Sequence, residues 1–143
     1  MNRRLNHSSI RCGTADDLNA VLEPWSTSGA PPTVTDALQP LHVLLDADSQ
    51  ALLVADASGE VVGSLIVACN GWRGSFYRLT VRPDHRRRGL ATRLVREGET
   101  RLRKRGAARL DAIVASDDAA AMSFRGAAGY ERQHSRWRFV CNL

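Results

Sequence analysis

The feature that most constrains this chain is a strand that runs through a basic turn into a helix beginning at a glycine. It lies in Leu79–Thr92. Apolar residues alternate up to Val81, arginines fill the turn, and Gly89 precedes a run with helical periodicity. A helix N-terminus presents N–H groups without intrahelical partners and the positive end of the helix dipole. The segment therefore predicts a site for a phosphate group.

The residues around the glycine suit an anion individually. Gly89 allows a close approach of the backbone. Ala91 is small and leaves room for a pyrophosphate, and Thr92 adds a hydroxyl donor. Two other phosphate-binding motifs fit less well, because the chain lacks Gly-Lys-Ser/Thr and has only one glycine of a GxGxxG. Asp111 stands about where a ribose-binding acid would fall, but the preceding strands read as antiparallel hairpins. An ordinary basic helix start is the remaining alternative.

The net charge of +5 also favours an anionic partner. Nine basic residues fall within one stretch: Arg86, Arg87, Arg88, Arg93, Arg96, Arg101, Arg103, Lys104 and Arg105. A nucleic-acid-binding domain is one explanation, but aromatic residues are only 6% and do not alternate with arginine as stacking platforms do. We therefore disfavour nucleic acid, and expect the distal arginines to form a solvated helix face.

The remaining pattern predicts a mixed α/β (α+β) fold: one domain over residues 1–143, whose central sheet of six or seven strands is flanked by about four helices. Expected strands are 9–12, 51–55, 61–69, 75–82 and 109–114, with one or two closing strands in 131–141. In the fourth strand, Tyr77, Leu79 and Val81 should share one face. The expected helices run from Thr14 to near Trp25, from Asp36 to near Leu45, from Leu90 to near Gly106, and from Asp117 or Asp118 to near Gly129. Pro40 should kink the second helix or lie in its first turn. Leu90, Leu94, Gly98 and Leu102 form the buried stripe of the third.

Cysteine spacing and hydropathy favour a cytoplasmic protein. Cys12, Cys69 and Cys141 form no CxxC pair and no Cys/His metal pattern, so we expect reduced, buried thiols and no metal. No apolar run approaches the roughly 20 residues of a membrane helix, and no apolar segment follows the basic N-terminus. We therefore expect no membrane partner.

The basic turn resembles the cofactor motif of the GNAT acetyltransferases. Arg86–Ala91 matches the pattern Arg/Gln-x-x-Gly-x-Gly/Ala, and Val81–Pro83 matches the Val-x-Pro before it. Downstream, Asp118–Tyr130 is similar to Asn-x-x-Ala-x-x-(aromatic)-Tyr-x-x-x-Gly-Phe/Tyr. The resemblance covers nearly the whole chain, and is strongest to small bacterial members similar to ribosomal-protein N-terminal acetyltransferases.

This resemblance implies acetyl-CoA as cosubstrate. Backbone amides of the glycine turn would hold the pyrophosphate, and the preceding strand would pair with the pantetheine arm as an added strand does. An N–H near Val81 would polarise the thioester carbonyl. Asp118 stands where relatives place a CoA-contacting Asn. The implied cofactor-binding residues are Leu79, Thr80, Val81, Arg86, Arg87, Arg88, Gly89, Leu90, Ala91, Thr92 and Asp118.

Two positions depart from the family pattern. Arg125 stands where related enzymes place a Tyr that protonates the leaving thiolate, and Ile113 stands where N-terminal acetyltransferases place a Glu base. Arg125 would stabilise a thiolate electrostatically, but it cannot act as a general acid. Tyr77 and Asp111 are the nearest substitutes for acid and base. The alternative readings of these three candidates are a solvated helix residue, a core Tyr and a surface Asp.

The predicted reaction is N-acetylation of a primary amine, in a small molecule or at a protein N-terminus, by direct attack in a ternary complex. Deprotonating a lysine costs about 4–5 kcal/mol at pH 7, whereas an α-amine costs about 1.4 kcal/mol. Without a strong base, an amine of low pKa is the easier acceptor, unless water relays the proton to a base. The acceptor pocket should lie between residues 25–38 and the hairpins of Trp72 and Trp137. An acyl-CoA-binding sensor that has lost catalysis is the alternative, and we expect a monomer or a homodimer.

Overall fold

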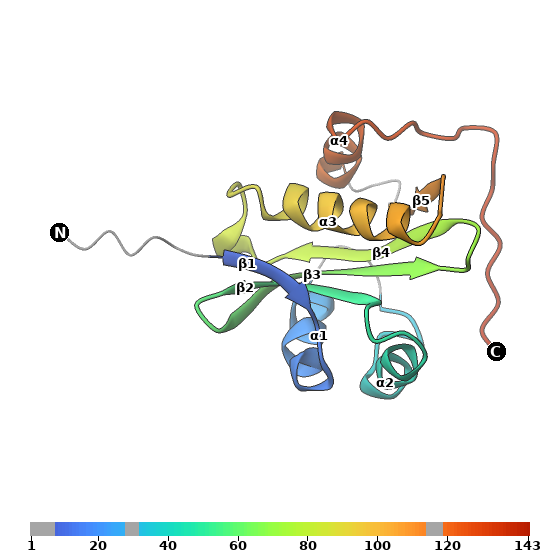
Figure 1. Cartoon of the computed structure of the whole chain (residues 1–143). Coiled ribbons are helices and arrows are strands. Elements are labelled where there is room, and N and C mark those ends of the chain that lie inside the picture. Colours follow the sequence, from blue (N-terminus) through green and yellow to red (C-terminus); the bar gives the residue numbers. More distant parts are fainter. Residues whose placement is uncertain (1–7, 28–31, 114–118) are drawn as a thin grey trace. The chain divides into compact units, whose positions relative to one another are not determined.

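The chain contains two compact units, residues 1–113 and 114–143. A computed structural model describes residues 8–27, 32–113 and 119–143. The first unit contains the sheet with helices α1 to α3, and the second contains helix α4 (Figure 1).

The described strands form one five-stranded sheet in chain order. They are β1 (Ser8–Cys12), β2 (Leu52–Ala57), β3 (Glu60–Cys69), β4 (Gly74–Val81) and β5 (Leu110–Ala112). The first four pair antiparallel, whereas β5 pairs parallel with β4. A parallel neighbour needs a crossover, and helix α3 (Leu90–Lys104) supplies it.

Helices cover both faces of this sheet. The helices α1 (Leu18–Thr27) and α2 (Leu38–Ala47) lie on one face, and α3 lies on the other (Figure 1). Two short 3-10 segments, η1 (Ala15–Asp17) and η2 (Pro83–His85), precede α1 and α3. In the second unit, α4 spans Ala119–Ala127. The fold class is therefore the mixed α+β class that the sequence predicts.

Local signals explain where the first two helices begin. Thr14 and Asp17 form the predicted capping pair: the Asp17 N–H donates to the Thr14 carbonyl at 3.0 Å, and the Thr14 N–H donates to Asp17 Oδ2 at 2.8 Å. Pro40 lies in the first turn of α2, where a missing N–H costs no intrahelical bond. Both observations confirm the sequence predictions.

The core has one part on each face of the sheet. Beneath α1 and α2, seven buried residues form one cluster: Leu18, Val21, Trp25, Leu41, Leu52, Val54 and Ile66. On the other face, the predicted stripe of α3 is buried against β3 and β4. Gly98 lies over Phe76 so closely that a β-carbon there would be 2.9 Å from two carbons of the ring. This glycine therefore sets how closely α3 approaches the sheet.

The predicted closing strands are absent from the described residues 131–143, so the described sheet has five strands and not six or seven. Trp137, Phe139 and Cys141 alternate as in a strand. A strand also needs a neighbour that completes its ladder, and propensity alone does not supply one. The strand predicted over 109–114 is likewise shorter, Leu110–Ala112, and Val114 lies outside the described residues.

The cysteines are free thiols, but the prediction that all three are buried was wrong. Cys69 is half-buried, whereas Cys12 and Cys141 are exposed. Cys12 is the last residue of β1, which is an edge strand of the described sheet.

An ion pair ties the end of α3 to the turn before β2. Arg105 donates from Nη1 to Asp48 Oδ2 at 2.6 Å and from Nη2 to Oδ1 at 2.9 Å. The side chains are 31% and 26% exposed, and the Gln50 N–H also donates to Asp48. The hydrogen bonds from Arg105 lower the pKa of Asp48. A lowered folded pKa stabilises the protein above the unfolded pKa of about 3.9, and this stabilisation is lost as the pH falls through the folded value.

We predict that Asp48→Asn lowers the free energy of unfolding by about 1 kcal/mol at pH 7, because a partly exposed bidentate pair contributes on this scale. The difference should be constant above about pH 5 and should shrink as the pH falls below about 4. Urea unfolding at a series of pH values measures it. The matched control is Asp46→Asn, on an exposed α2 position with no ion pair among the described residues. An Asp48→Asn deficit that stayed constant down to pH 2 would contradict this role of the charge.

Candidate functional site

The glycine turn has the geometry that its sequence predicts. Gly89 is the N-cap of α3, with φ 76° and ψ 10°, and Arg87 also has a positive φ, 61°. The Arg93 N–H donates to the Gly89 carbonyl at 3.0 Å, so the amides before it belong to the first helical turn. A β-carbon on Gly89 would meet no atom within 4 Å. Glycine is therefore needed here for its backbone conformation, and the space in front of the turn is open.

The arginines of this turn divide into structural and exposed ones. Arg86 Nε donates to the Val81 carbonyl at 3.0 Å and thereby closes the turn. Arg82 bonds Glu60 and Asp84, each at 3.0 Å. The side chains of Arg87 and Arg88, together with the backbone at Gly89, are exposed at the start of α3.

An acidic residue in the same turn remains charged near neutral pH. Asp84 Oδ1 lies 3.0 Å from His85 Nδ1, and Arg82 contacts the other carboxylate oxygen. The hydrogen bond from His85, followed by the charge of Arg82, lowers the pKa of Asp84. The neighbouring Arg82 therefore offsets the negative charge of Asp84. The exposed arginines, Arg87 and Arg88, keep their positive potential.

Further along α3, Arg93, Arg96, Arg103 and Lys104 are exposed, which agrees with the predicted solvated face, but several arginines of this stretch also have partners. Arg93 donates to Ser8, Arg101 contacts Gln50 and Cys12, and Arg105 contacts Asp48. Arg103 lies 3.6 Å from Glu99. Away from the turn, the basic stretch is therefore partly solvated surface and partly engaged with neighbouring elements.

Strand β4 has an open edge beside this turn. Its parallel partner β5 covers only Gly74–Phe76, so in the described part of the chain Tyr77–Val81 have no strand on that side. The Arg82 N–H donates to the Val62 carbonyl at 2.8 Å, on the β3 side. Because peptide groups alternate in direction along a strand, the N–H of Val81 points to the open edge. The structure thus places a run of backbone without a neighbouring strand next to the turn.

A bulge in β4 corrects one prediction. The register passes from Ile66↔Tyr77 to Ser64↔Thr80, so two residues of β4 stand opposite one residue of β3. Val81 pairs with Gly63, whose missing β-carbon would face Leu94 of α3. Tyr77 pairs with Ile66, on the face of α1 and α2. Tyr77 and Val81 therefore lie on opposite faces, because the extra residue shifts the alternation by one position.

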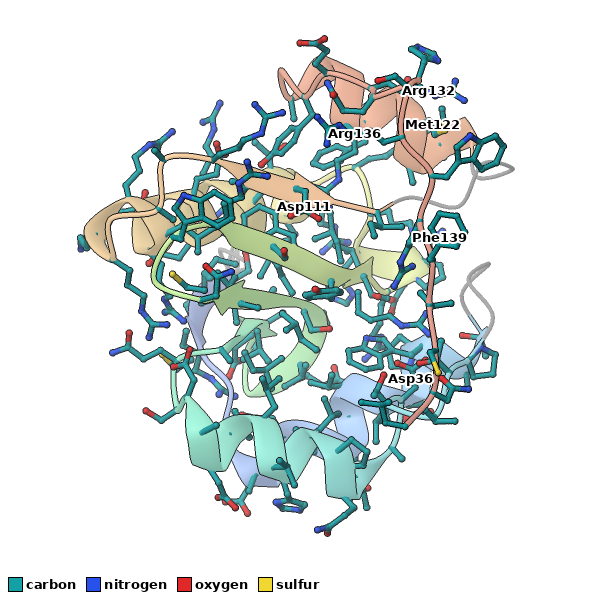
Figure 2. All side chains as sticks on the ribbon, turned by 90° about the vertical axis from the view of Figure 1, so that its right-hand side faces the viewer. Asp36, Asp111, Met122, Arg132, Arg136 and Phe139 are labelled. Atoms are coloured by element: carbon teal, nitrogen blue, oxygen red, sulfur yellow. The ribbon has the colours of Figure 1, made fainter. Side chains whose placement is uncertain are left out.

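The candidate acid, Tyr77, and the candidate base, Asp111, lie on the same face of neighbouring strands. Ser75 Oγ donates to Asp111 Oδ1 at 2.9 Å, and these residues are register partners on β4 and β5. Tyr77 follows Ser75 on the same face and is 44% exposed, so the alternative of a core Tyr was wrong. Figure 2 shows Asp111 on β5. Ser75 was missed because a small polar residue in a strand carries no signal until its cross-strand neighbour is known.

Two predicted residues belong to the second unit. Asp118 lies outside the described residues. The Arg125 guanidinium lies 5.2 Å from the centroid of the Tyr130 ring and 5.9 Å from that of Phe124. Arg125 is half-buried. Its role beside a thiolate stays a prediction.

In the described ranges, no three His, Cys, Asp or Glu side chains gather as metal ligands would. No described helix has the length and apolar character needed to cross a bilayer.

Comparisons with known proteins agree with this geometry. The family model described as Acetyltransferase (GNAT) family matches residues 16–130. An acetyltransferase of Sodalis glossinidius is 34% identical over 126 residues, which are 88% of this chain and 89% of that protein. An acetyltransferase of Pectobacterium atrosepticum is 34% identical over 122 residues, 85% and 86% of the two chains.

Two solved structures share the fold at lower identity. The aminoglycoside N-acetyltransferase AAC(6')-Iy in complex with CoA has a TM-score of 0.76 at 17% identity, covering 99% of both chains. Ard1 from Thermoplasma volcanium has a TM-score of 0.78 at 19% identity, covering 85% of this chain and 81% of that one. The chain belongs to the GNAT family of acetyltransferases. This confirms the predicted enzyme class, the acetyl-CoA-dependent N-acetyltransferases.

Proposed function

We propose that this protein transfers the acetyl group of acetyl-CoA to a primary amine by direct attack within a ternary complex. The observation that carries the proposal is the continuity of the open edge of β4 with the glycine turn of α3. The open edge suits an extended pantetheine arm, and the turn suits a pyrophosphate. Both lie within one stretch of chain, because the turn follows β4 directly.

The described residues fit the cosubstrate. The exposed start of α3 offers N–H groups and the positive end of a 15-residue helix. Acetyl-CoA supplies an activated thioester carbonyl when bound. The Val81 N–H points to the edge at which that carbonyl would lie, and a hydrogen bond from it would stabilise the charge that develops on the oxygen.

The amine side of the reaction requires a proton acceptor and a partner for the leaving group. The amine nitrogen bonds to the carbonyl carbon as the C–S bond breaks, and the proton of the amine replaces the acetyl group on sulfur. Asp111, held by Ser75, is our candidate to receive the amine proton through water. Tyr77 and Arg125 are the candidates to protonate or stabilise the thiolate.

We further propose that residues 1–143 work as one catalytic domain. The family match over residues 16–130 crosses the boundary between the two units and supports this reading. The acceptor is a primary amine of a small molecule or a protein N-terminus. Structural neighbours named as an aminoglycoside N-acetyltransferase and as Ard1 suggest testing both classes.

The first prediction concerns cofactor binding. Gly89→Glu should lower the affinity for acetyl-CoA at least about tenfold, because it places a negative charge where the pyrophosphate binds. Calorimetry measures the dissociation constant. The matched control is Gly71→Glu: Gly71 also has a positive φ, 85°, and open space around it, but lies in the hairpin at the opposite end of β4. Equal affinity in the two variants would contradict the site.

The second prediction concerns Arg125. If it balances the thiolate, Arg125→Ala should lower kcat and kcat/KM together by about tenfold or more, with little change in acetyl-CoA affinity. Arg125→Lys should recover part of the loss, because the charge remains. The assay measures free thiol with an acceptor found by screening aminoglycosides and free N-terminal peptides. Arg132→Ala, at an exposed position of the same unit, is the control.

Wild-type kcat in Arg125→Ala would remove Arg125 from the mechanism. Binding of acetyl-CoA by the wild-type protein, without acetylation of any amine in the screen, would favour the acyl-CoA-binding sensor.

A further inference from the structure

The bulge of β4 is built on an unfavourable backbone conformation. Arg78 has φ 54°, in the left-handed region that side chains with a β-carbon rarely adopt. It stands at the point where the register of β3 and β4 shifts. Glycine would adopt this conformation without steric cost, yet the chain places arginine there. Interactions of the arginine side chain must therefore offset the cost of the backbone.

A buried carboxylate supplies those interactions. Arg78 Nε donates to Asp36 Oδ1 at 3.1 Å, and Arg78 Nη2 bonds Asp36 Oδ2. Only 15% of the Arg78 side chain and 8% of the Asp36 side chain are exposed. A bidentate, charge-assisted pair shielded from water is strong and fixes the direction of the guanidinium. Breaking it from one side would leave an uncompensated buried charge.

Neighbouring groups hold the same pair from both sides. The Arg78 guanidinium lies 5.5 Å from the centroid of the Trp25 ring in α1, and Trp25 Nε1 is 3.4 Å from Ser64 Oγ in β3. The Thr33 N–H donates to Asp36 Oδ2 at 2.7 Å, and the Asp36 N–H donates back to the Thr33 carbonyl at 3.0 Å. Asp36 therefore joins the turn before α2 to the bulge, on the face opposite α3 (Figure 2).

The position of the bulge gives this pair a consequence for the open edge. Arg78 precedes Leu79–Val81, the stretch whose backbone is proposed to bind the pantetheine arm and the thioester carbonyl. A bulge rotates the strand and re-aims the groups that follow it. If the backbone of Arg78 left the left-handed region, the residues after it would return to the regular alternation of a strand. The Val81 N–H would then point away from the open edge.

We propose that Arg78 and Asp36 are positioning residues for acetyl transfer: their ion pair holds the bulge and thereby aims the Val81 N–H at the thioester carbonyl. This proposal rests on the proposed use of acetyl-CoA. It adds to that proposal two residues that touch neither the cofactor turn nor the reacting atoms. It also connects the turn before α2, on the side expected to form the acceptor pocket, to the strand that binds the donor.

The test needs no known acceptor, because it observes the donor itself. Acetyl-CoA carrying carbon-13 at the acetyl carbonyl is bound to the wild-type protein, and the carbonyl stretch is recorded by infrared difference spectroscopy. A hydrogen bond to the carbonyl oxygen moves the band to lower frequency. We expect this shift in the wild-type protein. Asp36→Asn and Arg78→Ala should return the band at least about halfway to its position in free acetyl-CoA, with less than about a threefold change in the dissociation constant.

Two further variants separate positioning from simple stabilisation. Arg78→Gly also removes the ion pair, but glycine adopts a positive φ freely, so it should restore a larger part of the shift than Arg78→Ala. Arg78→Lys keeps the charge without the planar fork and should fall between the wild-type protein and Arg78→Ala. Thermal unfolding shows whether Arg78→Ala folds. If it does not, Asp36→Asn and Arg78→Lys still test the proposal. The matched control, Asp48→Asn, breaks a different bidentate Arg–Asp pair, that with Arg105, and should leave the band unchanged.

The outcomes are distinct. A wild-type band in all folded Arg78 and Asp36 variants would overturn the proposal and make the pair purely structural. A wild-type protein that binds acetyl-CoA with the carbonyl band at its free position would also overturn it. A wild-type protein that does not bind acetyl-CoA would overturn the proposed function itself.

Discussion

The close packing of α3 over β4 is the contact on which the rest of the first unit depends. Gly98 allows the helix to lie directly on Phe76, which is 2% exposed, and Leu94 beside it is fully buried. A helix of 15 residues is a rod about 22 Å long, so contacts along its length fix the position of both ends. The N-terminus of α3 is thereby held at the end of β4. The anion-binding end of the helix and the open edge of the strand become parts of one surface.

The two faces of β4 have different uses. The face toward α3 is apolar and sets the helix in place. The opposite face carries Ser75, Tyr77 and Thr80, with the Arg78–Asp36 pair at the bulge. The bulge separates these uses, because it interrupts the alternation that would otherwise place Tyr77 and Val81 on one side. An irregularity of one residue thus determines which side chains of β4 face α3 and which face α1 and α2.

The arginines of α3 and of the turn before it also differ in their surroundings. The chain is strongly basic, yet along α3 several arginines beyond the first turn are engaged with carboxylates or carbonyls of the packed elements. Arg87 and Arg88 instead are exposed beside the glycine turn. At the start of the helix, the positive end of the helix dipole adds to the charge of these two side chains.

The sequence by itself determined the elements with strong local signals. The capping pair at Thr14 and Asp17, the stripe of α3 and the glycine at its start depend on contacts within a few residues, so local pattern predicts them. The resemblance to the family is carried by motifs of the same local kind, Arg86–Ala91 and Asp118–Tyr130. Pairings between distant residues were decided only by the tertiary structure: the Ser75–Asp111 bond, the Arg78–Asp36 pair and the bulge each join segments that lie far apart in the chain. The predicted closing strands failed for the same physical reason, because a strand exists only where another segment completes its hydrogen bonds.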